Sequence, residues 1–556
     1  MDVSRPCPPP AIEEKGGFQV KKGDTYDWVE NICSSEVIRE YSDLEKFYFH
    51  AHKVVKDSGL PNFKGARIEV PTHLNIDCWS TLLEGYEDSE IVHLLRYGFP
   101  VGYCKDSLPV SVIKNHNGAT EHPEFISRYI QKEISHQLLL GSLYCNPLSV
   151  PVAISPLNSV PKKDPGDRRV IADFSFPEDS SVNHGIPKDY YLGDQIDLSY
   201  PSVDSLALLL KQLGPGSHIF KKDLRRAYRQ FKIDPGDIHL CGYLWVGAVY
   251  LDLALVMGAR SAAFLCQRVT NALSFILKKS EVNVINYLDD ICCVSHPSCS
   301  LEEFEFVTET MKNLGLLESV EKLVPLSCNV EFLGVFFDSN AQTISVTESR
   351  LVEIQELVDH WLTRKRASKR ELQSLVGKVV FVSKCVLSSR VFISRILAVL
   401  RSLRSQHHRF KINAEFRKDL KWWKTFLQQF NGTSYIPDMI WAKADLSMST
   451  DACLQGIGGW SGNRFFSEEF PQAILAKSFY INVLELMAIM VGLRLWSSQF
   501  KDSRIQLYCD NEACVHVINS GRSKGKDMLR ILREIVFICA MDNFQIKAIH
   551  LPGVFN

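Results

Sequence analysis

Two adjacent carboxylates, Asp289 and Asp290, interrupt a run of strand-forming residues in the stretch "VINYLDDICCVSH". Aspartate is a poor strand former, and the apolar residues on both sides predict a β-hairpin with the two acids at its tip. Two explanations are open for the pair. Either it belongs to an ordinary turn that uses aspartate, or a divalent cation holds the two like charges together.

A third carboxylate, Asp223, ends a predicted strand in "SHIFKKDLRRAY". An aspartate at a strand end and a pair at a hairpin tip can bring three carboxylates close together. Such a cluster becomes favourable around Mg²⁺ or Mn²⁺, which prefer hard oxygen ligands. Two ions in one site can activate an attacking 3′-hydroxyl and stabilise a leaving pyrophosphate. The three aspartates therefore predict a two-metal site for nucleotidyl transfer.

A second set of acids follows later in the chain. Asp451 ends a strand in "MSTDACLQGIGGW", Glu485 lies early in the helix "VLELMAIMVGLRLW", and Asp510 ends the strand "QLYCD". Two strand ends and a helix can meet at one edge of a sheet, so these acids predict a second metal site. For each acid taken alone, a helix cap or a surface charge is the alternative.

The elements around these acids indicate a multidomain α+β and α/β protein, because runs of strands and alternating strands and helices are both present. The 556 residues, 46% hydrophobic and 23% charged, suffice for three or four domains. We expect an intracellular protein, cytoplasmic or nuclear, without a membrane partner. The reasons are the absence of a signal peptide, the charges in every window of about 20 residues, and sixteen cysteines without paired spacing.

The net charge of −1 hides a basic segment. Residues 361–424 carry 17 Lys and Arg against 3 Asp and Glu on a helical pattern. This imbalance predicts a face that binds a polyanion. A solvated helix surface is the alternative, but such surfaces usually mix the two signs.

Six motifs, in one order over residues 168–337, resemble those of the reverse transcriptase family. They are "RRVIADFS", "KKDLRRAY", "VMGARSAAF", "YLDD", "GLLESVEK" and "EFLGVFF". The third motif departs from the family pattern, since Ala263 stands where a proline is common and Met257 precedes the glycine. The resemblance implies a right-hand polymerase with fingers, palm and thumb.

The resemblance also implies a role for each matching residue. Asp223 and Asp289 would bind the metal ions, with Asp290 beside them. Tyr228 would exclude a ribose 2′-hydroxyl, because an aromatic ring beneath the sugar leaves no room for that oxygen. The remaining implied roles are triphosphate binding by Arg169 with Lys162 or Lys163, close nucleotide approach at Gly258, pyrophosphate contact by Lys322, and primer positioning by Leu333 and Gly334. For Tyr228 a plain core aromatic, and for Lys322 a solvated lysine, are the alternatives.

The acids Asp451, Glu485 and Asp510 resemble the ribonuclease H family, in which acidic residues hold two Mg²⁺ and water attacks RNA in an RNA–DNA hybrid. The final "IHLPGVFN" contains His550 and resembles a stretch that a fourth acid follows, just past Asn556. This yields the hypothesis that the unit is truncated at its C-terminal end and cleaves hybrids weakly or not at all.

The predicted organisation has five parts. The Pro-rich composition predicts a disordered tail (1–22), and short helical patterns predict an N-terminal helical extension (23–130). The resemblance implies reverse transcriptase fingers and palm (131–340), a basic helical thumb and connection (341–440), and a C-terminally truncated ribonuclease H-like domain (441–556). The implied partners are an RNA template, a DNA or RNA primer, deoxynucleoside triphosphates and RNA–DNA hybrids, with two Mg²⁺ or Mn²⁺ per active site.

Two further stretches, "KRELQSLVGKVVFVSKCVLSSRVFISRIL" and "DSEIVHLLRYGFPVGY", resemble retrotransposons that carry a tyrosine recombinase (DIRS-like elements). A long-terminal-repeat element is the alternative source. Two other functions are alternatives: a degenerate polymerase fold that only binds RNA, and an RNA-templated RNA polymerase. The three intact carboxylates Asp223, Asp289 and Asp290 argue against a fold that only binds RNA. Tyr228 and the ribonuclease H-like acids argue against an RNA-templated RNA polymerase.

Overall fold

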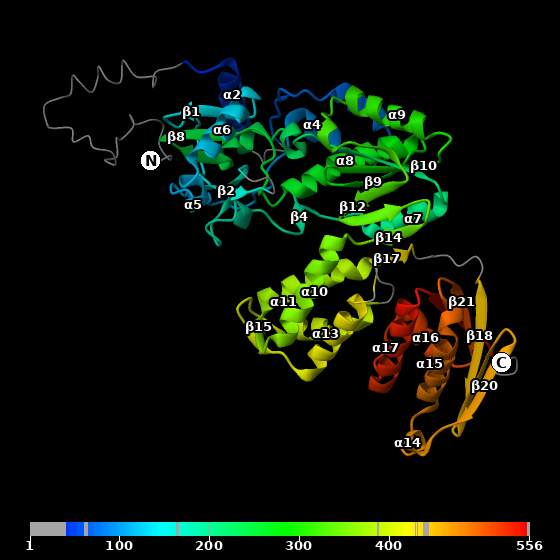
Figure 1. Cartoon of the computed structure of the whole chain (residues 1–556). Coiled ribbons are helices and arrows are strands. Elements are labelled where there is room, and N and C mark those ends of the chain that lie inside the picture. The colour runs from blue at the N-terminus through cyan, green and yellow to red at the C-terminus, as the bar shows by residue number, and fades with distance from the viewer. Residues whose placement is uncertain are drawn as a thin grey trace. The chain divides into compact units, whose positions relative to one another are not determined.

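A computed structural model describes residues 40–59, 65–162, 166–197, 199–385, 389–428, 430, 432–436 and 444–552. The predicted tail, residues 1–22, lies outside the described residues. The chain divides into two compact units, Met1–Pro201 with Ile219–Leu326, and Ser202–His218 with Ser327–Asn556. Both units mix helices with sheets, which confirms the expected α+β character at this coarse level (Figure 1).

The first unit is organised around a four-stranded sheet in the order β11-β6-β10-β9. Its strands are β6 (His218–Asp223), β9 (Asn283–Tyr287), β10 (Asp290–Ser295) and β11 (Val324–Ser327). Strands β9 and β10 form the predicted hairpin, with Tyr287 paired to Asp290. Leu288 and Asp289 therefore make the two-residue turn, and Leu288 has a φ of 54°, as tight hairpin turns require.

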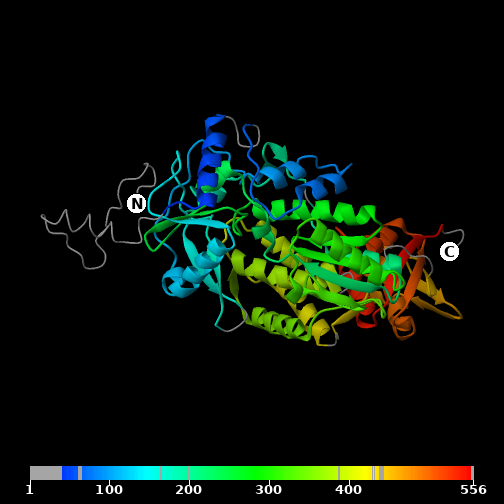
Figure 2. The ribbon, with the colours of Figure 1, turned by 90° about the horizontal axis from the view of Figure 1, so that it is seen from above.

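Helices bury the faces of this unit. Helix α8 (Ala262–Lys279) places Leu265, Val269 and Leu273 in the core with no exposed surface, and their spacing is that of one helix face. Helix α4 (Ile91–Tyr97) lies beside α8 in both views of the chain (Figures 1 and 2). The residues expected to form an N-terminal extension therefore share one hydrophobic core with the sheet.

The remaining elements of the first unit include a second hairpin. The strands are β1 (Leu139–Leu143), β8 (Ala248–Asp252) and β7 (Gly242–Trp245) in one sheet, the hairpin β2 (Leu157–Pro161) and β3 (Arg168–Ala172), and the short pair β4 (Tyr190–Tyr191) and β5 (Asp194–Gln195). The helices are α2 (Asp43–Asp57), α3 (Ile76–Leu82), α5 (Asn117–Thr120), α6 (Pro123–Ser135) and α9 (Ser300–Asn313).

The second unit begins with a sheet and a helical group. The sheet has the order β12-β13-β14-β17, with β12 (Asn329–Phe332), β13 (Val335–Asp338), β14 (Thr343–Ser345) and β17 (Thr433–Tyr435). The helices are α10 (Glu348–Thr363), α11 (Lys369–Val382), α12 (Ser394–Ser402) and α13 (Ala414–Leu427), joined by the ribbon β15 (Arg366–Ser368) and β16 (Arg409–Lys411).

Helix α7 (Val203–Leu213) also belongs to the second unit. Ser202 is its N-cap residue, and the Ser202 hydroxyl accepts the Asp204 backbone N–H. The Gln342 side-chain amide donates to the carbonyl of Leu210 at 3.5 Å, and the Gly216 backbone N–H donates to Ser339 at 3.3 Å. These bonds join α7 and the residues after it to the β13–β14 turn. No short-range pattern in the sequence predicts this contact.

The last part of the second unit is a five-stranded sheet in the order β20-β19-β18-β21-β22. Strands β18 (Leu446–Ala452), β21 (Arg504–Cys509) and β22 (Gln545–His550) run parallel, and β19 (Gly456–Ser461) and β20 (Arg464–Glu469) extend the sheet in antiparallel order. The helices are α14 (Gln472–Leu475), α15 (Ile481–Phe500), α16 (Glu512–Ser520) and α17 (Lys526–Met541). The predicted alternation of strands and helices is confirmed.

Among the described helices, α15 is the one that is long and apolar enough to cross a membrane, by length and composition alone. Half of its apolar window is buried inside the protein. It packs against β18 and β19 and carries the buried carboxylate Glu485. A core helix satisfies the same criteria of length and apolarity.

Candidate active sites

The three aspartates of the first unit meet where β6 ends beside the hairpin tip. The backbone N–H of Leu224, the residue after Asp223, donates to the carbonyl of Asp289 at 3.0 Å. Burial, and then the other carboxylates, raise the pKa values of Asp223 and Asp290. The fold thus concentrates negative charge at one point, which a divalent cation would stabilise.

Two lysines contact this cluster. The Nζ of Lys322 lies 2.9 Å from both carboxylate oxygens of Asp223, and the Nζ of Lys221 lies 2.8 Å from Asp290. Lys322 reaches the site because the backbone N–H of Ser319 donates to the Asp223 carbonyl at 2.8 Å. Within the described part of the chain no ion pair involves the Asp289 side chain.

A polar stripe on helix α8 holds the hairpin that carries the aspartates. The side chain of Gln267 donates to the Asn286 carbonyl at 2.9 Å and accepts the Leu288 backbone N–H at 2.6 Å. The Asn286 side chain accepts from Ser274 at 2.7 Å and donates to Thr270 at 3.0 Å. Because buried polar groups must be paired, this network fixes the tip. The polar residues at positions 267, 270, 271 and 274 share one helix face, and this spacing is a signal in the sequence that the predictions did not include.

Tyr228 and Gly258 have different surroundings. Tyr228 is half-buried next to the cluster, and burial followed by the negative charges of nearby groups, including Asp289, raises its pKa. Gly258 has a φ of 130°, and a Cβ there would lie 2.8 Å from the Ala172 carbonyl oxygen. The glycine is therefore required by close packing against the end of β3.

The residues expected to bind the triphosphate lie on the β2–β3 hairpin. Arg169 is exposed on β3. Lys162 pairs with Asp167 across the turn at 2.6 Å, and Lys163 lies outside the described residues. Leu333 and Gly334, in the second unit, form the β12–β13 turn with φ values of 49° and 76°. Their predicted roles toward nucleotide and primer stay predictions.

Two acids of the second set, Glu485 and Asp510, come together at one edge of the five-stranded sheet, whereas Asp451, exposed on a neighbouring strand, is not part of their close group. Strands β18 and β21 are parallel, with Ser449 level with Tyr508. Continuing this register by two residues places Asp451 level with Asp510 at the carboxyl ends of neighbouring strands. The spacing of strands in a sheet sets their Cα atoms about 5 Å apart. Glu485 projects from α15, which packs on β18.

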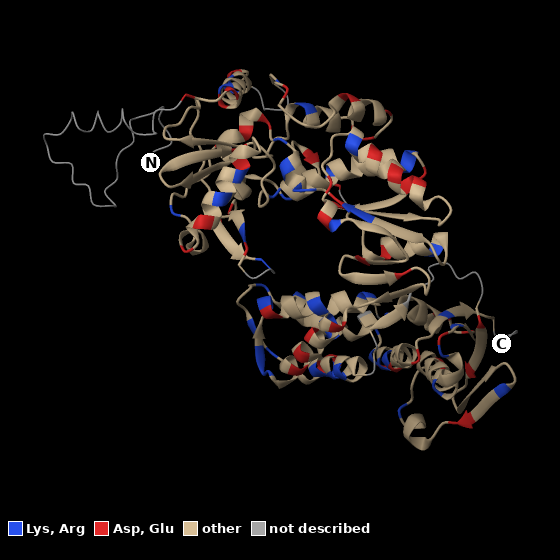
Figure 3. Cartoon of the chain, turned by 45° about the horizontal axis from the view of Figure 1, so that its top comes forward, with Lys and Arg blue, Asp and Glu red and all other residues tan. Residues whose placement is uncertain are grey.

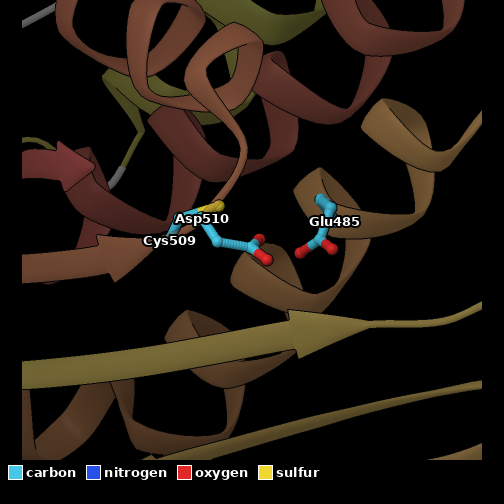
Figure 4. A group of neighbouring side chains, drawn as sticks. All are labelled: Glu485, Cys509 and Asp510. Atoms are coloured by element: carbon cyan, nitrogen blue, oxygen red, sulfur yellow. The ribbon is translucent and has the colours of Figure 1, made fainter. Parts of the chain in front are cut away.

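Glu485 is a buried acid with an unsatisfied oxygen. Only 3% of its surface is exposed, and within the described part of the chain its Oε2 has no hydrogen-bond partner. Burial, followed by the nearby Cys509, Asp510 and Asp451, raises the pKa of Glu485 to about 8. One oxygen each from Glu485 and Asp510 and the sulfur of Cys509 lie within 4.8 Å of one another (Figure 4). The predictions did not include Cys509.

His550, the last residue of β22, lies beside the same edge. Its Nε2 is 3.0 Å from the carbonyl oxygen of Asp510. Each site offers carboxylate oxygens at one point, and the donor sets therefore fit the Mg²⁺ or Mn²⁺ that the sequence predicted.

The basic segment mixes its charges with acids, contrary to the expectation. Figure 3 shows acidic and basic bands on the same helices of the second unit. Lys378 pairs with Glu353 at 2.7 Å, and Lys424 pairs with Asp359 at 2.8 Å. The window 361–424 excluded the acidic side of helix α10, and so overstated the imbalance.

One part of this segment remains strongly positive. On the β15–β16 ribbon, the exposed residues Arg366 and Lys411 are direct cross-strand partners. Like charges in that arrangement destabilise a sheet. An anion such as a phosphate would relieve the repulsion, so this ribbon is the best-supported polyanion contact in the segment.

Comparison with known proteins gives only distant similarity. No family model and no curated protein matches the chain. Among solved structures, the foamy viral protease-reverse transcriptase "dRH" with double-stranded DNA has 15% identity and a TM-score of 0.49, covering 94% of this chain and 85% of that one. The foamy viral protein with an RNA/DNA hybrid has 16% identity and a TM-score of 0.46, covering 93% and 64%. With double-stranded DNA the values are 16% and 0.46, covering 93% and 99%.

Proposed function

We propose that this chain is the RNA-directed DNA polymerase of a retroelement, with an attached ribonuclease H-like unit. The observation that carries the proposal is the junction of β6 with the hairpin tip, where Asp223, Asp289 and Asp290 meet through the 3.0 Å bond from Leu224 to Asp289. An ordinary turn would not require a third acid at this point, whereas a two-metal site does.

The residues of the first site have distinct tasks. Asp223 and Asp289 would hold the cations, which when bound activate a 3′-hydroxyl and neutralise phosphate charge. Partial burial acts to lower the pKa of Lys322, but hydrogen bonds and attraction from Asp223 and its neighbours raise it overall. Lys322 therefore remains an ammonium ion that can offset the charge of a triphosphate. Lys221 neutralises Asp290 and keeps it beside the tip.

The other parts of the proposal follow from the resemblance and agree with the observed elements. The first unit would supply fingers and palm, and helices α10–α13 with the positive β15–β16 ribbon would supply a thumb that contacts the duplex backbone. The acids at the edge of the five-stranded sheet would cleave RNA in RNA–DNA hybrids. The partners would be an RNA template, a primer and deoxynucleoside triphosphates inside the cell, and the element would be of the tyrosine-recombinase kind.

Primer extension by the full chain tests the proposal. With an RNA template, a DNA primer, deoxynucleotides and Mg²⁺, we expect extension that chelation of the metal abolishes. Template binding without any extension would favour the alternative, a degenerate fold that only binds RNA. Magnesium-dependent cleavage of a labelled RNA–DNA hybrid tests the second activity separately.

Replacing Tyr228 with alanine tests the choice of sugar. The ring lies beside the catalytic cluster, and forcing a hydroxyl against it should cost about 1–3 kcal/mol, which corresponds to roughly 5- to 150-fold in rate. We expect Tyr228→Ala to lose that much discrimination against ribonucleotides, measured as the ratio of incorporation efficiencies. Tyr228→Phe keeps the ring and should keep the discrimination. If Tyr228→Ala only lowers stability, the residue is a core aromatic.

A further inference from the structure

The acidic edge of the five-stranded sheet contains a thiol in addition to its carboxylates. The Cys509 sulfur and one oxygen from each of Glu485 and Asp510 lie within 4.8 Å of one another. Figure 4 shows the Glu485 and Asp510 carboxylates pointing toward each other beside the end of β21. Mg²⁺ takes oxygen ligands, so a site for Mg²⁺ alone has no use for the sulfur.

One hydrogen-bonding observation indicates that the group accommodates a ligand. Oε2 of Glu485 is buried and has no hydrogen-bond partner among the described residues, and an unpaired buried acceptor costs stability unless something satisfies it. The Cys509 sulfur accepts the backbone N–H of Asn511 at 3.4 Å and lies 4.0 Å from the carbonyl oxygen of the same residue, whereas the neighbouring thiol of Cys514 donates to the carbonyl of Asn482 at 3.1 Å. Of these two thiols, Cys509 is the one grouped with the carboxylates of Glu485 and Asp510.

The geometry suits a cation with mixed oxygen and sulfur ligands. Around a tetrahedral Zn²⁺, two ligand atoms lie about 3.3–3.5 Å apart, given bond lengths of about 2.0 Å to oxygen and 2.3 Å to sulfur. The observed limit of 4.8 Å means that each pair closes by no more than about 1.5 Å. Rotation of the long Glu485 side chain can supply this for its two pairs, and side-chain rotation of Cys509 and Asp510 must supply it for the third. Three protein ligands and one open position are the usual arrangement when water or substrate completes the shell.

We propose that Glu485, Cys509 and Asp510 bind a soft divalent cation such as Zn²⁺ or Cd²⁺. Thiolate ligands select such ions. The cation shares two ligands with the proposed Mg²⁺ site, so each metal excludes the other. The ligands Asp223, Asp289 and Asp290 of the other site are all carboxylates. The soft cation should therefore occupy the site with Cys509 and leave the site with the three aspartates to Mg²⁺.

Titration of the full chain with Cd²⁺ tests the binding directly. A cadmium–thiolate bond has a charge-transfer absorption in the ultraviolet, which can be followed with a non-thiol reductant present. We expect Cys509→Ser to lose one tight equivalent of this signal, and Glu485→Gln, which keeps the thiol, to weaken binding at least about 10-fold. Added Mg²⁺ should weaken Cd²⁺ binding to the unmodified chain because the two metals share Glu485 and Asp510.

Cys539→Ser is the matched control. Cys539 is a thiol of helix α17, and the charged group that acts on it is Asp542, not Glu485 or Asp510. We expect it to keep full Cd²⁺ binding. An unchanged titration in Cys509→Ser, or in Glu485→Gln with circular dichroism like the parent, would overturn the proposal. So would an equal loss of signal in Cys539→Ser.

A second measurement uses the proposed activities, on which it depends. In the parent chain, Zn²⁺ at a concentration that saturates this site should inhibit hybrid cleavage and leave primer extension unchanged. Equal inhibition of both activities would contradict the site's selectivity. A chain that cleaves no hybrid would count against the proposed ribonuclease activity, while the Cd²⁺ titration would still decide whether the metal site exists.

Discussion

Asp289→Asn is expected to reduce deoxynucleotide incorporation by at least about 1,000-fold, because a metal ion in such a site supplies several kcal/mol of transition-state stabilisation. The substitution removes the charge and keeps the shape. The fold should survive, since it is the backbone carbonyl of Asp289 that accepts from Leu224. Single-turnover incorporation on an RNA template measures the effect.

Asp194→Asn is the control for this prediction. Asp194 is an exposed aspartate on the β4–β5 pair of the same unit, and its replacement should leave the rate within about twofold, as surface substitutions usually have small effects. A thermal melting curve like that of the parent would show that the loss in Asp289→Asn is chemical. If Asp289→Asn retained a tenth of the activity or more, the two-metal assignment would be wrong.

Asp419→Ala is expected to destabilise the second unit by about 3–5 kcal/mol, the usual cost of removing one partner from a buried ion pair. Asp419, on helix α13, has no exposed surface. It accepts from Arg395 Nη1 at 2.9 Å and pairs with Arg533 Nη2 at 3.1 Å. Arg533 lies on α17, which packs against α15, and 7% of its side chain is exposed. Alanine would leave two guanidinium groups without their shared carboxylate.

Denaturant unfolding followed by fluorescence measures this prediction, with the transition of the second unit compared between variants. Glu415→Ala is the matched control, because Glu415 pairs with the same Arg395 at 3.0 Å from a position that is 55% exposed. Exposed pairs contribute at most about 1 kcal/mol. Equal effects of the two substitutions would show that the Asp419 network does not stabilise the contact between α13 and α17.

The sequence identified both acid sets and the elements that carry them. The structure contains the predicted elements. They are the hairpin with Asp289 and Asp290, the strand that ends at Asp223, and the alternating strands and helix that carry Asp451, Glu485 and Asp510. These features depend on short-range rules: strand periodicity, turn chemistry and helix capping act over a few residues and can be read without the fold. The roles toward nucleotide and primer stay predictions.

The tertiary structure decided which groups face these acids. Three contacts join segments that are distant in the chain or on different elements. They are the ion pair of Lys221 with Asp290, the bonds from helix α8 to Asn286, and the approach of the Cys509 sulfur to Glu485. The acids on α10 that neutralise the basic segment, and the place of α7 in the second unit, have the same origin. Periodicity tells which face of an element is buried, but the partner of that face is chosen by the packing of the whole unit.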